Sequence, residues 1–154
     1  MSEPAVKLFP AWKQAVADFL AAGFAPGDVI PHAWLAAHFG MPVLNDASTL
    51  SVAEFQDRQF TWLANIEALK SELLEAHQIY LSSVHGKGWQ WVPPQAQTNA
   101  AVKRFEHEAK RAYRKAGHGL MHLRVAELTD EQRRENMDAI GRLSMLEGMH
   151  RAIE

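Results

Sequence analysis

The spacing of apolar and polar positions predicts short elements at the start of the chain. An apolar repeat near 3.6 residues covers residues 7–22 and predicts an amphipathic helix that ends before Gly23. A turn at residues 25–28 and a short strand at Val29-Ile30 follow. Pro31 suits the first turn of a helix and Gly40 a helix end, so residues 32–39 are expected to form a second helix, followed by a loop at 41–50.

The strongest helical signal follows that loop. Ser51 and Glu54 have the spacing of a capping box, in which each side chain bonds the backbone of the other residue. After them, one face of the predicted helix is apolar: Phe55, Trp62, Ile66, Leu69 and Leu73. We expect this helix to run to about Ala76, with a break near residues 58–60 as an alternative.

The period then changes to that of a β-hairpin. Residues 79–84 favour a strand, residues 89–92 alternate, and two glycines in His85-Gly86-Lys87-Gly88 permit a tight turn. Trp89 and Trp91 point to the same side of their strand. We expect them to pack the hairpin onto the helices, like the other tryptophans (Trp12, Trp34 and Trp62); a platform on which nucleic-acid bases stack is the alternative.

The C-terminal part is predicted to be helical. Residues 95–98 are expected to form a linker, and residues 99–126 a helix that Gly117-His118-Gly119 could interrupt. Thr129 and Gln132 form a second capping box. The tail after it carries apolar residues that are predicted to form one narrow stripe: Met137, Ile140, Leu143, Leu146, Met149 and Ile153. Such a stripe must be buried, either on the preceding helix or in a homodimer.

Length and composition fit a compact chain with two parts. The 154 residues are 47% hydrophobic, enough for one domain, predicted at 1–94, and a helical extension at 99–154. The absence of cysteine excludes a disulfide framework, a thiolate zinc site and a cysteine nucleophile. No signal peptide or membrane-spanning run is recognisable, so we expect a cytoplasmic protein with no membrane partner.

Charge is distributed unevenly along the chain. The whole chain has a net charge of −2, which argues mildly against nucleic-acid binding. Residues 1–102 hold 5 basic and 9 acidic residues, residues 103–124 hold 7 basic and 2 acidic, and residues 125–154 hold 4 basic and 7 acidic. The central segment therefore has a net charge of +5, and a local field of this kind attracts phosphates unless it is simply a solvated helix face.

Signatures of catalysis are weak. The chain contains no Gly-x-Ser-x-Gly elbow, and Gly86-Lys87-Gly88 lacks the spacing of a phosphate-binding loop. His118 and His122 could share a helix face for a metal ion, but no carboxylate is an obvious third ligand. We therefore expect a protein without catalytic activity, metal or cofactor.

The order of elements predicts a mainly α (α+β) fold: a winged helix-turn-helix with one β-hairpin wing, followed by a C-terminal helical hairpin. Three features carry a resemblance to a family: Gly27-Asp28-Val29-Ile30-Pro31, the helix from Phe55, and the segment His77 to Pro94 with its Gly-Lys-Gly-Trp turn. Over residues 24–150 the chain resembles small winged-helix proteins encoded by bacteriophages and prophages. The resemblance implies nucleic-acid binding inside a bacterial host cell.

Two sets of residues are candidates for contact with DNA. Arg58, Thr61 and Asn65 on the long helix could read base edges, although Glu72 and Glu75 at its end would repel phosphates. A second set could contact phosphates: Lys87, Lys103, Arg104, Lys110 and Arg111. The sequence thus predicts a DNA-binding regulator or accessory factor of phage type, whose long helix and hairpin contact double-stranded DNA. The alternative is a winged-helix module that binds a replication, packaging or host-defence protein.

Overall fold

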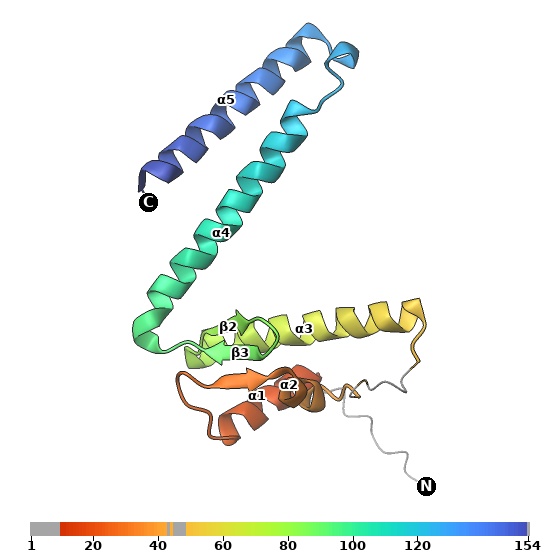
Figure 1. The fold of residues 1–154 in the computed structure, drawn as a ribbon, viewed down its shortest axis with the longest axis vertical. Coiled ribbons are helices and arrows are strands. Elements are labelled where there is room, and N and C mark those ends of the chain that lie inside the picture. Colours follow the sequence, from red (N-terminus) through yellow and green to blue (C-terminus); the bar gives the residue numbers. More distant parts are fainter. Residues whose placement is uncertain (1–9, 43, 45–48, 154) are drawn as a thin grey trace. The chain divides into compact units, whose positions relative to one another are not determined.

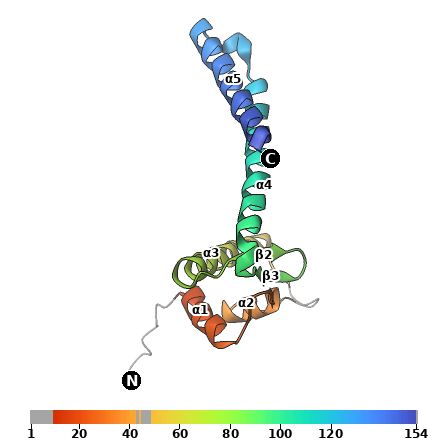
Figure 2. The same ribbon diagram turned by 90° about the vertical axis from the view of Figure 1, so that its left-hand side faces the viewer.

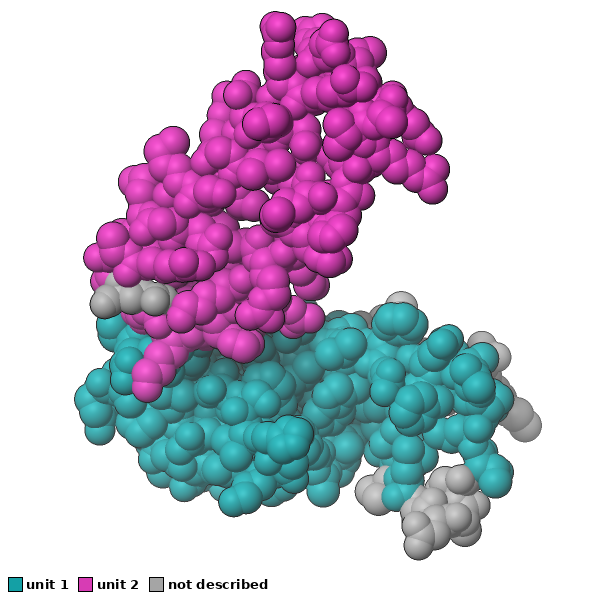
Figure 3. Space-filling view, turned by 45° about the horizontal axis from the view of Figure 1, so that its top comes forward, with its two compact units in different colours: residues 1–100 teal, residues 101–154 magenta. Residues whose placement is uncertain are grey.

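The computed structural model describes residues 10–42, 44 and 49–153. These residues are mainly helical and include a small three-stranded antiparallel sheet. The elements, labelled in Figure 1, are α1 (Ala11–Ala21), β1 (Val29–Pro31), α2 (His32–His38), α3 (Val52–His77), β2 (Leu81–Val84), β3 (Gly88–Trp91), α4 (Pro94–Met121), the 3₁₀ turn η1 (Val125–Glu127) and α5 (Asp130–Ile153). The chain divides into unit 1, residues 1–100, and unit 2, residues 101–154, coloured separately in Figure 3.

The predicted hairpin is confirmed, and it pairs with a third strand. The strand order is β1-β3-β2, with both pairs antiparallel. Trp89 in the central strand lies opposite Ile30 of β1 and Ser83 of β2. At Gly88 the backbone of β1 is so close that an added Cβ would overlap the carbonyl oxygen of Ile30. Only glycine fits at this position without moving β1.

The core of unit 1 lies where α1, α2, the second half of α3 and the sheet meet. Its largest fully buried side chains are Phe19, Ile30, Leu35, Ile66, Leu69 and Leu73. The Phe19 ring lies 5.1 Å from that of Phe24 and 5.8 Å from that of Trp91, measured between centroids. All five tryptophans are partly buried against this cluster, as predicted: Trp12, Trp34, Trp62, Trp89 and Trp91.

Both predicted capping boxes are present. The Ser51 hydroxyl accepts a hydrogen bond from the Glu54 backbone N–H, and the Glu54 carboxylate accepts one from the Ser51 N–H, both at 3.2 Å. The same reciprocal pair joins Thr129 and Gln132, at 3.2 and 3.0 Å. From its cap, α3 runs without a break through residues 58–60 and ends before Gln78, which is left-handed. α1 ends where expected, before Gly23 with φ +77°.

Several predicted boundaries are wrong or lie outside the described residues. The linker expected at residues 95–98 is part of α4, because the fixed φ of Pro94 starts a helix as readily as it stops a strand. The helix continues through Gly117 and Gly119 without a break (Figure 1; Figure 2 shows α4 from the side, partly behind α5), but ends at Met121 rather than at residue 126. The expected start of the first helix at residue 7 and part of the expected loop at 41–50 lie outside the described residues.

Unit 2 consists of α4 and α5 packed against each other in opposite directions. His150 of α5 lies beside Phe105 and Tyr113 of α4, with ring centroids 5.7 and 6.0 Å away. Nearer the segment that connects α4 to α5, a Cβ added to Gly117 would lie 3.8 Å from the Leu143 side chain. None of the described residues of unit 2 is buried. This hairpin therefore has a seam of half-buried side chains instead of a core.

The single apolar stripe predicted for the tail is wrong. Ile140 and Leu143 are half-buried on the seam, whereas Met137, Leu146 and Met149 are 70%, 54% and 58% exposed. The physical reason is the spacing of these residues. Three residues advance a helix by about 300°, so each step falls about 60° short of a full turn and the series winds around α5.

One further property concerns membranes. Among the described residues, no helix combines the length and the apolar character that crossing a bilayer requires.

Candidate nucleic-acid interface

The basic residues of α4 share one face of the helix. At 100° per residue, the six cationic side chains fall within an arc of about 140° on the side of α4 that turns away from the apolar seam. All six are exposed: Lys103, Arg104, Lys110, Arg111, Arg114 and Lys115. His107 and His118 fall within the same arc and are also exposed. We call these six basic side chains the basic arc.

Acidic neighbours neutralise little of the basic arc. Glu106 and Glu108 project near its two edges, and Glu108 accepts a hydrogen bond from Arg104 at 2.9 Å. Four other members form no ion pair with any residue that the structure describes: Lys103, Arg111, Arg114 and Lys115. The arc thus presents a concentrated positive charge that can attract a polyanion, such as a chain of phosphate groups.

The tip of the hairpin presents one more cation. Lys87 is exposed in the turn between β2 and β3. Its backbone N–H donates to the carbonyl of Val84 at 3.0 Å, and its carbonyl accepts from the His32 N–H at 3.3 Å. The turn is fixed at both backbone groups, while the ammonium group remains exposed at the tip.

The structure brings the three base-reading candidates together on one flank of α3. Arg58, Thr61 and Asn65 fall within about 60° of each other in projection. The amide of Asn65 already donates to the carbonyl of Thr61 at 2.9 Å, and the Arg58 side chain is half-buried against α2. Of the three, only Thr61 is exposed. This flank therefore offers fewer free polar groups than the sequence suggested.

The face of α3 that points away from the core carries acidic side chains and an exposed aromatic ring. Asp57, Glu67 and Glu75 lie there, and Phe60 among them is 69% exposed. Carboxylates at this position repel phosphates, and a phenyl ring has no hydrogen bond to offer a base edge. The electrostatic surface suited to DNA is consequently on α4 and at the hairpin tip.

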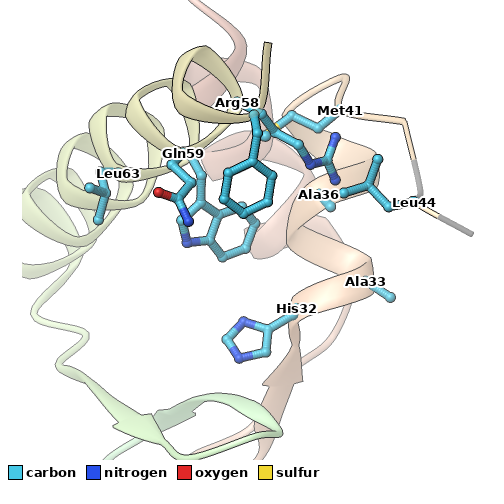
Figure 4. A pocket seen from close by; sticks show the side chains of 10 residues that line it. His32, Ala33, Ala36, Met41, Leu44, Arg58, Gln59 and Leu63 are labelled. Carbon is cyan, nitrogen blue, oxygen red and sulfur yellow. The ribbon is translucent and has the colours of Figure 1, made fainter. Parts of the chain in front are cut away.

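A pocket that the sequence did not reveal lies between α2 and the first half of α3. Its volume is about 580 Å³, and Figure 4 shows the side chains around it. The lining is largely apolar and aromatic: His32, Ala33, Ala36, Met41, Leu44, Phe55, Arg58, Gln59, Trp62 and Leu63. Arg58 extends from α3 toward Ala36 and Leu44, with no ion pair to any described residue. Phe55, assigned to the core face, is instead 46% exposed at this pocket.

The two histidines considered as metal ligands lie close together. Their ring centroids are 4.3 Å apart, and Nδ1 of His122 lies 2.7 Å from the carbonyl oxygen of His118. In the part of the chain that the structure describes, no group of three or more His, Cys, Asp or Glu side chains is placed to hold a metal ion. The histidine pair belongs to the C-terminal end of α4, where one ring caps a helix carbonyl.

Comparison with known protein families, curated proteins and solved structures finds no match to this chain. The resemblance to phage winged-helix proteins therefore stays a prediction from the residues that carry it.

Proposed function

We propose that this protein binds duplex DNA mainly through phosphate contacts, as a non-catalytic regulator or accessory factor of phage type. The observation that carries the proposal is the basic arc of α4, in which four exposed cations lack an ionic partner among the described residues. Lys87 adds a cation at the hairpin tip. Contacts of this kind give affinity and orientation but little sequence information.

The arrangement of unit 1 supports the winged-helix part of this proposal. The element order α1-β1-α2-α3-β2-β3 and the strand order β1-β3-β2 are those expected of a winged helix-turn-helix. In that design the third helix approaches the major groove and the hairpin approaches the neighbouring backbone. Because α3 carries Asp57, Glu67 and Phe60 outward, we expect weak discrimination between DNA sequences.

The test is the salt dependence of binding to random duplex DNA. The full chain is compared with Arg111→Gln/Arg114→Gln, which removes two charges from the basic arc. The matched control is Arg134→Gln/Arg142→Gln, which removes the same two charges from exposed positions of α5. We expect the wild type and the control to show the same steep slope of log affinity against log salt. The α4 variant should lose about 0.9 of slope for each phosphate contact removed.

A third variant, Lys87→Glu, tests the hairpin tip in the same assay and should also flatten the slope. The absence of binding at low salt would overturn the proposal. So would an equal loss of slope in both arginine pairs, because the α4 surface would then have no special role.

Docking of a protein partner is the second candidate function, and a specific observation favours it. The first half of α3 contributes no buried residue and exposes Val52 (76%), Phe60 (69%) and Leu63 (53%), of which Leu63 lines the pocket. Arg58 at the pocket forms no ion pair with any described residue and suits a carboxylate, so the fitting partner is an amphipathic helix with apolar side chains and an acidic residue. Such a surface is typical of protein interfaces.

This candidate is tested by affinity purification from bacterial cells. The wild-type chain is compared with Leu63→Lys at the pocket and with Ala64→Lys, an exposed neighbour outside it. A partner retained by wild type and by Ala64→Lys but lost by Leu63→Lys supports docking at the pocket. Equal recovery with all three chains contradicts it.

A further inference from the structure

Two hollows lie between α4 and α5, within unit 2. Their volumes are about 530 and 290 Å³, and they share the side chains of Tyr113, Arg114 and Glu147, so together they make one depression. We call this depression the α4–α5 trough. Its basic, acidic and phenolic side chains are Lys110, Tyr113, Arg114 and Lys115 of α4, and Glu147 and Arg151 of α5.

The trough is strongly basic. Four of the side chains that line it are cationic, and among the described residues that line it Glu147 is the single carboxylate. Three of the cations belong to the basic arc of α4, whereas the fourth, Arg151, comes from α5. The trough therefore extends the positive surface of α4 across to the second helix.

Arg151 is oriented by an ion pair that leaves most of its donors available. Its Nη2 atom donates to the Glu147 carboxylate at 2.6 Å, across one turn of α5. A guanidinium carries five N–H groups in a planar fork, so this one bond leaves donors for another anion. The Arg151 side chain is 70% exposed, which makes those donors accessible to a ligand from solvent.

The α4 side of the trough adds further donors. Arg114 is exposed and forms no ion pair with any described residue. Tyr113 is half-buried next to it, and the Tyr113 hydroxyl makes no hydrogen bond to any residue that the structure describes. Guanidinium groups bind phosphate oxygens in pairs, and a phenol can donate one more hydrogen bond. The two helices thus surround one depression with donors suited to an anion that has several acceptor oxygens.

On the basis of the proposed function, we propose that the α4–α5 trough binds backbone phosphates of duplex DNA, so that α5 contributes to DNA binding through Arg151. A ligand with a single carboxylate needs one cation, but the trough presents four beside the rest of the basic arc. A chain of phosphates suits such a surface better than an isolated charge. Contacts of this kind position the DNA without reading its sequence.

Glu147 gives the proposal a distinctive consequence. A phosphate bound in the trough lies near the Glu147 carboxylate, and like charges repel each other. Glu147 therefore weakens DNA binding even though it orients Arg151. Removing its charge should strengthen binding, which a damaged fold cannot do.

The test is binding of the full chain to random duplex DNA over a series of salt concentrations. Arg151→Gln should reduce the slope of log affinity against log salt by about 0.9, which is the loss of one phosphate contact. Glu147→Gln should raise the affinity about threefold at low salt. Circular dichroism compares the helicity of the variants with that of the wild type. If Arg151→Gln loses helicity, the gain expected from Glu147→Gln decides.

The matched controls are Arg142→Gln and Glu135→Gln. They remove the same charges from exposed positions of α5 that do not line the trough and that project about 180° and 160° away from Arg151. Because these positions face away from the bound phosphates, each control should change the affinity by less than about twofold.

The possible results distinguish the trough from the proposed function. If the wild type binds and Arg111→Gln/Arg114→Gln loses slope, but Arg151→Gln and Glu147→Gln behave like their controls, the trough does not bind phosphates although the proposed function stands. No binding by the wild type overturns both. Equal gains from Glu147→Gln and Glu135→Gln also contradict the trough, because net charge alone would then determine affinity.

Discussion

The two units of this protein are stabilised in different ways. Unit 1 buries thirteen apolar residues in a cluster that draws on α1, α2, α3 and the sheet. Unit 2 is almost as rich in large apolar side chains, yet none of its described residues is buried. The difference shows that apolar content alone does not make a core, because apolar side chains must converge from several directions to exclude water.

The largest expected effect is the loss of packing at the centre of unit 1. Phe19→Ala removes a side chain that is 1% exposed and surrounded by aromatic rings. It should lower the free energy of unfolding by about 3–5 kcal/mol, measured by urea denaturation followed by tryptophan fluorescence. The neighbouring Leu20→Ala, at a position 46% exposed, should cost less than about 1 kcal/mol. Similar losses for both would show that the core is centred elsewhere.

The next effect concerns the sheet of unit 1. Gly88→Ala forces a methyl group into the carbonyl oxygen of Ile30 and should cost about 3 kcal/mol as β1 moves away from β3. Gly86→Ala is the control, because its φ of +71° carries a strain of about 1–2 kcal/mol but no atom lies within 4 Å of the added Cβ. Thermal unfolding distinguishes the two. If Gly86→Ala proved the more harmful, the close approach of β1 would not be the deciding constraint.

Removing a helix cap tests how far the local loss of stability spreads through each unit. Ser51→Ala and Thr129→Ala each remove a side-chain acceptor at a helix start and should cost about 1 kcal/mol. In unit 1 the first half of α3 contributes no fully buried residue, so hydrogen exchange after Ser51→Ala should quicken in residues 52–63 only. In unit 2 exchange should quicken along α5, because no core holds that helix in place. Uniform quickening across unit 1 would contradict this difference.

The smallest effect has the opposite sign. Gly141→Ala and Gly148→Ala lie within α5, where nothing is found within 4 Å of an added Cβ. Each should stabilise unit 2 by about 0.5–1 kcal/mol, seen as greater helicity on heating in circular dichroism. A loss of helicity would mean that these glycines allow another surface to approach closely.

Local sequence signals predicted the elements of this protein well. Ser51 with Glu54, and Thr129 with Gln132, located two helix starts, since a cap depends on residues three positions apart. Gly86 and Gly88 located the hairpin turn for the same reason. Pro94 misled the prediction, because a proline that ends a strand and one that begins a helix look alike in sequence.

The sites were harder to predict because they depend on direction in space. Counting charges located the basic segment of α4, but only the helical projection shows that six cations share one arc. The pocket requires α2 and α3 to be adjacent, which no local pattern specifies. Asn65 has a side chain suited to reading base edges, but its amide is bonded to the Thr61 carbonyl, one turn earlier in the same helix, which the sequence does not show.

The pairing of β1 with β3 has a consequence for how the chain folds. Ile30 and Trp89 are neighbours in the sheet although about 60 residues separate them, and closing so long a loop costs entropy before any contact is gained. During synthesis β1 must wait, unpaired, until α2, α3 and the whole hairpin have left the ribosome. We therefore expect closure of this sheet to be the slow step in the folding of unit 1.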